Sequence, residues 1–264
     1  MAKTTDRDKM PGAQSIDRAL SLLSAFTPQH PQQRIADLVA SSGLGQSTVS
    51  RMVSAMLSLG FLSHDTRSGL YSLGPQVVNL AAVALNQNVV HHQARPVAQR
   101  LAAELGLGVN VAQRYDDRLF YLCNFEGEAA PRSATLIGRG GPLHATALGK
   151  CLLLDDSPEE IGQALGSSFE KYTASTITTL SALLEELERV REQGYSVEHE
   201  ELALRRACVA VPIRDRGGNV VAAMSVSGPL SAIRLPERAD ELSALLIEQA
   251  DHVSTGLGFS ALSA

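Results

Sequence analysis

The beginning of the chain carries apolar residues at helical spacing in three short segments. The spacing predicts an amphipathic helix over about 15–26 and a short second helix from Ile35 that Gly43 stops. A third helix is expected from Gln46 or Ser47 to just before Gly60. A tight glycine-containing turn joins the second and third helices, which is the pattern of a helix-turn-helix.

The third helix has two opposite faces. One stripe, at positions i, i+3, i+4 and i+7, is apolar and consists of Val49, Met52, Val53 and Met56. A second stripe, displaced by about 200° at helical pitch, has short hydroxyls and one guanidinium: Ser47, Ser50, Arg51 and Ser54. Short polar side chains let a helix approach base edges, and arginine can donate two hydrogen bonds to guanine. An ordinary solvated face more often carries Glu and Lys, so the pattern favours DNA reading.

Two β-capable runs, 61–64 and 70–73, flank the turn-rich segment 65–69. They predict a hairpin directly after the third helix, which is the wing of a winged helix. Arg67 lies at the expected tip, where it could contact a phosphate or enter the minor groove. A surface arginine with no such contact is an equally good interpretation.

After Gly74-Pro75, helix and strand signals alternate irregularly. The pattern predicts a linker helix over 76–93 and a second helix from Val97 to Leu105. Further helices are expected around 180–190 and over about 236–254. The predicted strands cover 109–115, 119–125, 134–137, 195–200, 207–213 and 220–226. Hairpin-like connections between strands favour a largely antiparallel α+β domain.

Composition narrows the class of protein. The chain has 264 residues, of which 44% are hydrophobic and 19% charged, so it can build a core. No apolar run approaches the ~18–20 residues that span a bilayer. Residues 1–11 lack the apolar run of a secretory signal and are expected to form a disordered tail. Three separated cysteines, Cys123, Cys151 and Cys208, favour a reducing cytoplasm over a disulfide framework.

The charge is unevenly distributed between the two parts of the chain. Residues 1–75 contain 7 Lys and Arg against 5 Asp and Glu, a net of +2. Residues 76–264 contain the remaining 16 and 23, a net of −7, and the two sum to −5. This mild asymmetry is typical of a first part that faces a polyanion and a second part with another task.

Several enzymatic and metal chemistries lack their motifs. Gly149-Lys150 does not form a phosphate-binding loop, because position 144 is His and Cys151 replaces the magnesium-binding hydroxyl. No Gly-x-Ser-x-Gly surrounds Ser225 or Ser227, so the elbow of a serine hydrolase is missing. Cys208 lies in an apolar run and is interpreted as a packing residue rather than a nucleophile. No histidine spacing indicates a metal site, and we assign no catalytic residue, metal or cofactor.

Four segments in the C-terminal part closely resemble signatures of one family, in order and in spacing. They are 142–150 (PLHATALGK), 194–201 (GYSVEHEE), 208–215 (CVAVPIRD) and 222–229 (AAMSVSGP), and 44–51 (LGQSTVSR) resembles the same family's recognition-helix entry. The family is the IclR family of bacterial transcriptional regulators, and the resemblance runs from about Gly12 to Gly258. Two departures stand out: Glu198 where Asp is frequent, and no glycine in 202–207 shortly before the cysteine.

The resemblance implies a winged helix-turn-helix over 12–75, the linker helix, and a GAF-like effector-binding domain over 94–260. Such proteins act as dimers or tetramers on operator DNA. The expected DNA-binding residues are Gln46, Ser47, Thr48, Ser50, Arg51, Ser54 and Arg67. Ser225 and Ser227 are two apart on a strand, so their hydroxyls share one face. By resemblance they line an effector cavity together with Ala147, Leu148, Glu198 and Cys208.

Backbone N–H groups at the start of a helix near Ala147, two serine hydroxyls and a weak S–H donor would suit a carboxylate. The alternative is a pair of serines that the backbone satisfies in the core. Glu198 would repel an anionic ligand unless it is protonated or bonds a ligand hydroxyl or amine. The sequence therefore predicts a repressor that senses a small metabolite, with a small-molecule enzyme carrying an accessory DNA-binding domain as the alternative. Turnover of a candidate metabolite would favour the enzyme. A rise in the unfolding temperature on adding the metabolite, with no product formed, would favour the sensor.

Overall fold

The computed structural model describes residues 13–129 and 136–260, and the chain divides into two compact units after Ala84. The tail expected over residues 1–11 lies outside the described residues. Within the described ranges, no helix has the length and apolar character to cross a membrane.

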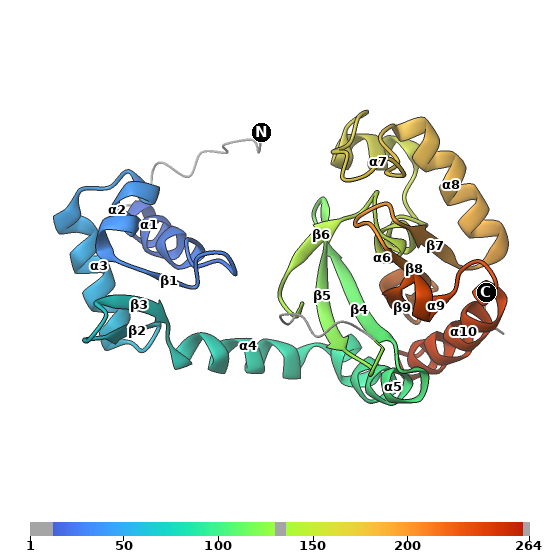
Figure 1. The fold of residues 1–264 in the computed structure, drawn as a ribbon, viewed down its shortest axis with the longest axis horizontal. Coiled ribbons are helices and arrows are strands. Elements are labelled where there is room, and N and C mark those ends of the chain that lie inside the picture. Colours follow the sequence, from blue (N-terminus) through green and yellow to red (C-terminus); the bar gives the residue numbers. More distant parts are fainter. Residues whose placement is uncertain (1–12, 130–135, 261–264) are drawn as a thin grey trace. The chain divides into compact units, whose positions relative to one another are not determined.

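The first unit has the predicted winged helix-turn-helix (Figure 1). Its helices are α1 (Ala13–Ser24), α2 (Ile35–Ser42) and α3 (Gln46–Ser58). Its small antiparallel sheet has the order β1-β3-β2, with β1 at Gln32–Gln33, β2 at Leu62–Asp65 and β3 at Leu70–Leu73. Apolar side chains from all three helices and the hairpin form its core: Leu22, Leu38, Val49, Val53, Met56 and Leu62. The apolar stripe of the third helix is therefore the packed face, as its spacing predicts.

The linker region differs from the single helix expected over 76–93. Helix α4 (Pro75–Gln87) ends before Asn88, and α5 then runs without interruption through Val89–Leu105. Asn88 has extended backbone angles, and its side chain accepts a hydrogen bond from the N–H of His91 at 2.9 Å. It is therefore the N-cap of α5, and the helix expected to start at Val97 is only the second half of α5. Pro96 lies inside α5 rather than at a boundary.

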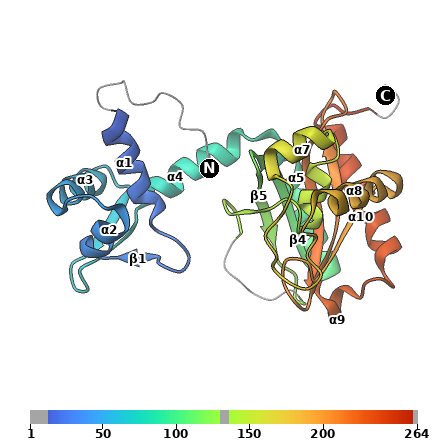
Figure 2. The same ribbon diagram turned by 90° about the horizontal axis from the view of Figure 1, so that it is seen from above.

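The second unit is built on one six-stranded sheet, whose neighbouring strands are all antiparallel. The strand order is β6-β5-β4-β9-β8-β7. The strands are β4 (Gly108–Tyr115), β5 (Arg118–Phe125), β6 (Gly140–Pro142), β7 (Ser196–His199), β8 (Arg206–Arg214) and β9 (Val220–Pro229). Figure 2 shows two of its strands, β4 and β5, side by side. A strand was expected over 134–137, and this prediction is wrong for Leu136 and Ile137, the two residues of that range that the structure describes, because neither lies in a strand. The edge strand β6 begins three residues after Ile137.

Helices pack on the two faces of this sheet and divide the core in two. On one face α5 and α10 (Ala239–Gly256) pack against alternate residues of the central strands, such as Val109, Val209 and Val226. On the other face lie the short helix α6 (Ala147–Leu152) and α8 (Leu180–Gln193), with α7 (Pro158–Leu165) packed on α8. A one-turn helix, α9 (Leu230–Ile233), follows β9.

Helix α6 approaches its neighbouring segment so closely that one position requires glycine. A Cβ atom on Gly149 would lie 2.3 Å from the carbonyl oxygen of Leu143. Two backbone segments therefore touch at this point, and any side chain would force them apart. The contact fixes the start of α6 against the segment that leads into it from β6.

Candidate functional site

Antiparallel pairing lines up polar residues in two rows across the α6 face of the sheet. In one row, Glu198 pairs with Cys208, Cys208 with Ser227, and Ser227 with Gly108. The next row runs through Ser196, Ala210, Ser225, Asn110 and Asn124. Directly paired residues point to the same face of a sheet, so the hydroxyls, amides, carboxyl and thiol converge.

A cavity of about 440 Å³ lies over these rows. The small side chains of the sheet leave room beneath α6, and the walls come from the start of α6, the β5–β6 region and the segment after β7. All six predicted effector residues line this cavity: Ala147, Leu148, Glu198, Cys208, Ser225 and Ser227. The volume falls within the range typical of small-molecule sites.

The polar atoms on the cavity floor form a short hydrogen-bonded chain. Asn124 donates from Nδ2 to Oδ1 of Asn110 at 2.9 Å, and Asn110 donates from Nδ2 to Oγ of Ser227 at 3.2 Å. Ser225 is different: its Oγ is buried and has no hydrogen-bond partner among the described residues. A buried hydroxyl without a partner costs about 1–3 kcal/mol, and a ligand oxygen or nitrogen could recover that energy.

The start of α6 supplies further donors. Thr146 caps the helix, because its Oγ1 accepts from the N–H of Gly149 at 3.0 Å and donates to the carbonyl of Pro142 at 2.8 Å. The first N–H groups of a helix have no partner within the helix, and in α6 these belong to Ala147 and Leu148. Both residues are almost fully buried and line the cavity.

Glu198 and Cys208 lie side by side at one end of the cavity. Glu198 is 4% exposed, and burial raises the pKa of its carboxyl. Burial also raises the pKa of the Cys208 thiol well above its ordinary value, and the neighbouring Glu198 charge adds to this effect. Cys208 is therefore a protonated S–H group, which is a weak donor and a poor nucleophile.

The first unit presents its predicted DNA-facing residues at the surface of α3 and the hairpin. Gln46, Ser47, Arg51 and Ser54 are exposed, while Thr48 and Ser50 are half-buried. Arg67 is exposed in the turn between β2 and β3, where the Asp65 carboxylate accepts from the Arg67 N–H at 2.9 Å and from Ser68 Oγ at 2.7 Å. These bonds hold the turn in shape and leave the guanidinium at its tip.

Both units match families of known proteins. Residues 82–255 match the family described as bacterial transcriptional regulator IclR C-terminal, and residues 15–66 match the IclR helix-turn-helix domain. The chain is 32% identical to the HTH-type transcriptional repressor AllR of Salmonella typhi, over 94% of this chain and 91% of that protein. The chain belongs to the IclR family.

Solved structures of the IclR family share the fold. A regulator from Alicyclobacillus acidocaldarius superposes with a TM-score of 0.82 at 28% identity, covering 93% of this chain and 99% of that one. A homologue from Microbacterium hydrocarbonoxydans, solved as a complex with 4-hydroxybenzoate, superposes with a TM-score of 0.80 at 24% identity, covering 92% and 98%. The family assignment decides between the two functions that the sequence left open, in favour of the regulator over the enzyme.

Two of the cavity residues that the sequence did not predict in this IclR-family chain are asparagines. Asn110 and Asn124 lie on the same row as Ser225 and connect to Ser227 by hydrogen bonds. The signal was an amide inside an otherwise apolar strand, flanked by Val109 and Val111 in the first case. Such an amide needs a polar partner when it is buried, and this requirement points to a polar site.

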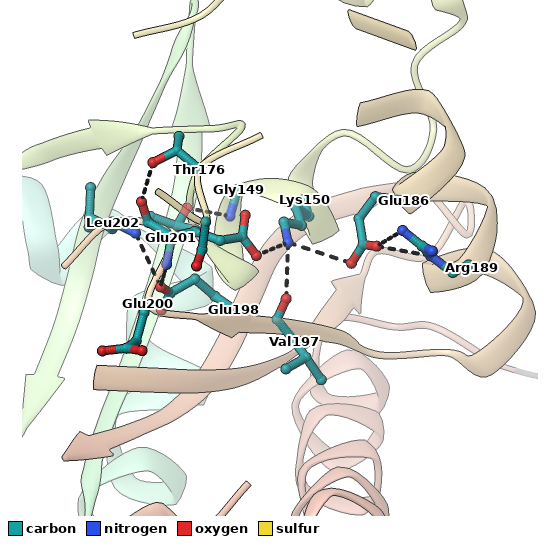
Figure 3. Close-up of polar contacts among 12 residues, drawn as sticks. Gly149, Lys150, Thr176, Glu186, Arg189, Val197, Glu198, Glu200, Glu201 and Leu202 are labelled. Carbon is teal, nitrogen blue, oxygen red and sulfur yellow. Dashed lines mark hydrogen bonds and ion pairs between the residues drawn. The ribbon is translucent and has the colours of Figure 1, made fainter. Parts of the chain in front are cut away.

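A buried lysine is fixed behind the cavity wall (Figure 3). Lys150 is 1% exposed, and its Nζ donates to Glu201 Oε1 at 2.6 Å and to the carbonyl of Val197 at 3.0 Å. Glu186 on α8 lies 3.5 Å from the same Nζ and is itself paired with Arg189 at the surface. The ion pair joins α6 to the segment after β7, whose Leu202 lines the cavity.

We predict that Lys150→Met destabilises the fold strongly, by about 3–5 kcal/mol, because it leaves the Glu201 carboxylate buried without its cation. The matched control is Arg189→Met, which removes a cation from the same cluster at a side chain that is 67% exposed. That change should cost less than about 1 kcal/mol. Urea unfolding of both variants measures the difference. Equal and small losses of unfolding free energy in the two variants would mean that the buried ion pair does not hold this wall.

Proposed function

We propose that this chain is a transcriptional repressor that binds operator DNA through α3 and the hairpin. We further propose that a small carboxylate in the C-terminal cavity modulates that binding. The observation that carries the effector part is the buried, unpartnered hydroxyl of Ser225 inside a cavity lined by further donors. Repressor names among the relatives and the 4-hydroxybenzoate complex of the Microbacterium homologue support the proposal.

The DNA part rests on the polar face of α3. Its apolar face packs in the core, so Ser47, Arg51 and Ser54 are presented outward on a rigid helix. A helix start with Gly45 as N-cap and no side-chain cap leaves backbone N–H groups available for a phosphate oxygen. Direct base reading would fall to Arg51, and positioning on the backbone to the shorter residues and to Arg67.

We predict that Arg51→Ala costs about 1–3 kcal/mol of affinity for the DNA sequence selected from a random pool, and relaxes the preference for it. Arg67→Ala provides the comparison, since loss of a phosphate contact weakens all sequences alike and flattens the salt dependence. Titrations of both variants with selected and unrelated DNA at several salt concentrations separate loss of base reading from loss of a phosphate contact. Unchanged binding by Arg51→Ala would remove α3 as the reading helix.

The cavity hypothesis predicts opposite effects of Ser225→Ala on binding and on stability. Effector affinity should fall by about 1–3 kcal/mol, because a donor to the ligand is lost. Stability without effector should hold or rise, because the hydroxyl has no partner to lose. Calorimetry with a panel of small carboxylates that includes 4-hydroxybenzoate, together with thermal unfolding, measures both.

Ser227→Ala is the matched variant, because its hydroxyl already accepts from Asn110 and its loss should also lower stability. Operator binding without effector should stay intact in both variants, since no DNA-facing group changes. If Ser225→Ala, Ser227→Ala and Cys208→Ala all keep full effector affinity, the effector binds elsewhere.

We also propose that the chain acts as a homo-oligomer, either a dimer or a tetramer. Specific sites are usually read by two copies on paired half-sites. Helix α4 buries none of its side chains within the chain, and Val78, Leu80 and Val83 are 71%, 48% and 46% exposed. An apolar helix of this kind gains stability when a second copy covers it.

We predict that Leu80→Asp weakens self-association at least tenfold, because a carboxylate at an apolar interface loses its hydration. Asn79→Asp on the same helix adds the same charge at a position that is already polar and exposed, and should change association less. Sedimentation at micromolar concentration gives the self-association constants of both variants. A strictly monomeric wild-type protein with full operator affinity would contradict this assembly.

A further inference from the structure

The carboxyl group of Glu198 is held on one side by the main chain (Figure 3). Its Oε1 accepts from the N–H of Glu201 at 2.6 Å and from the N–H of Leu202 at 3.1 Å. These two bonds engage one oxygen, and the residue lines the cavity on which the effector proposal rests. Oε2 is not used by the two main-chain donors, and the carboxyl lies beside the Cys208 thiol, so Oε2 is the oxygen that could carry a proton.

The charged and titratable groups around Glu198 come from every element packed against it. They are Cys208 and Arg206 on β8, Tyr121 on β5, Lys150 on α6 and Glu201 in the segment after β7. Lys150 directs its Nζ to Glu201 and to the Val197 carbonyl. Burial raises the pKa of Tyr121 to about 12, so its phenol is neutral near pH 7.

The charge of the cavity lining depends on Glu198. The described lining residues include two cations, Arg139 and Arg206, and two acids, Glu126 and Glu198. With both acids ionised the formal sum is zero, and an incoming carboxylate would face the buried Glu198 anion. With Glu198 protonated the sum is +1, and its O–H becomes a donor to the ligand.

We propose that Glu198 takes up one proton when a carboxylate effector enters the cavity, and that the resulting O–H donates to the ligand. The inference rests on the proposed carboxylate effector and adds the group that takes up the proton and the regulation of binding by pH. Burial raises the pKa of Glu198 in the free protein, and the two N–H groups, the Cys208 thiol and Lys150 offset this only in part. An added anion raises that pKa further, which is the linkage that drives proton uptake.

The direction of the pH effect follows from this linkage. Affinity is highest when Glu198 is already protonated in the free protein. Above that pKa, binding must draw a proton from solution, so affinity falls as pH rises, by up to tenfold per pH unit. The loss stops above the pKa that Glu198 has in the complex. The affinity is best measured between roughly pH 5.5 and 8, because carboxylate ligands are ionised throughout this range.

The experiment is calorimetry of the full-length protein with 4-hydroxybenzoate, benzoate and acetate across this window. Repeating it in two buffers of different ionisation enthalpy counts the protons taken up, which should approach one above the pKa of free Glu198. Glu198→Gln imitates the protonated carboxyl, because its amide oxygen can accept the same two N–H bonds and its NH₂ can donate to the ligand. The variant should bind with little pH dependence and exceed the wild type several-fold at pH 8.

Glu126→Gln is the matched control, since it removes an acid from the same lining and should leave the proton count near one. Affinity of the wild type that is independent of pH, with no proton uptake, would overturn the inference while leaving the cavity as the effector site. Weaker binding by a folded Glu198→Gln would also overturn it, in favour of an ionised Glu198 that accepts from a ligand hydroxyl or amine. If none of the three carboxylates binds at any pH, the proposed carboxylate effector itself fails. Should the variant not fold, the wild-type proton count alone decides.

Discussion

The antiparallel register between β7, β8, β9 and β4 is the constraint on which the cavity depends. Because side chains alternate along a strand, this register sends Ser225 and Ser227 to the α6 face and Val226 to the α5 and α10 face. A slip of one residue would exchange the two sets and bury valines where the cavity is. The apolar contacts of Val109 and Val209 on the far face therefore fix the polar site on the near face.

The wall of the cavity after β7 is held from two sides by polar contacts. On one side, Glu201 is paired with the buried Lys150. On the other, Thr176 Oγ1 donates to the carbonyl of Glu201 at 2.6 Å and accepts from the N–H groups of residues 172 and 173. A short irregular segment would otherwise be a low-stability region, and these bonds keep its N–H groups directed at Glu198. Electrostatics inside the second unit thus sets both the shape and the charge of the site.

Much of this fold follows from periodicity, and the exceptions have physical causes. The stripe of Val49, Val53 and Met56 predicted α3 and its packed face, because a 13-residue helix with one apolar face has few alternatives. The boundary at Asn88 was missed, because apolar residues continue on both sides of it and the pattern reads as one helix. The spacing of Ser225 and Ser227 placed both on one face, whereas the positions of Asn110 and Asn124 near them depend on long-range strand pairing. No local pattern encodes that pairing.

The two units carry different chemistry, and this separation limits how an effector can act. The cavity residues belong to the second unit and the polar face of α3 to the first, so no described effector residue is also a predicted DNA contact. An effector bound in the cavity would then act on DNA affinity indirectly, by favouring one arrangement of the proposed oligomer over another. The coupling is reciprocal: an effector that weakens operator binding tenfold, about 1.4 kcal/mol, is itself bound tenfold more weakly by the operator complex. A proton taken up at Glu198 would join the same linkage, so that pH, effector and operator would act on one equilibrium.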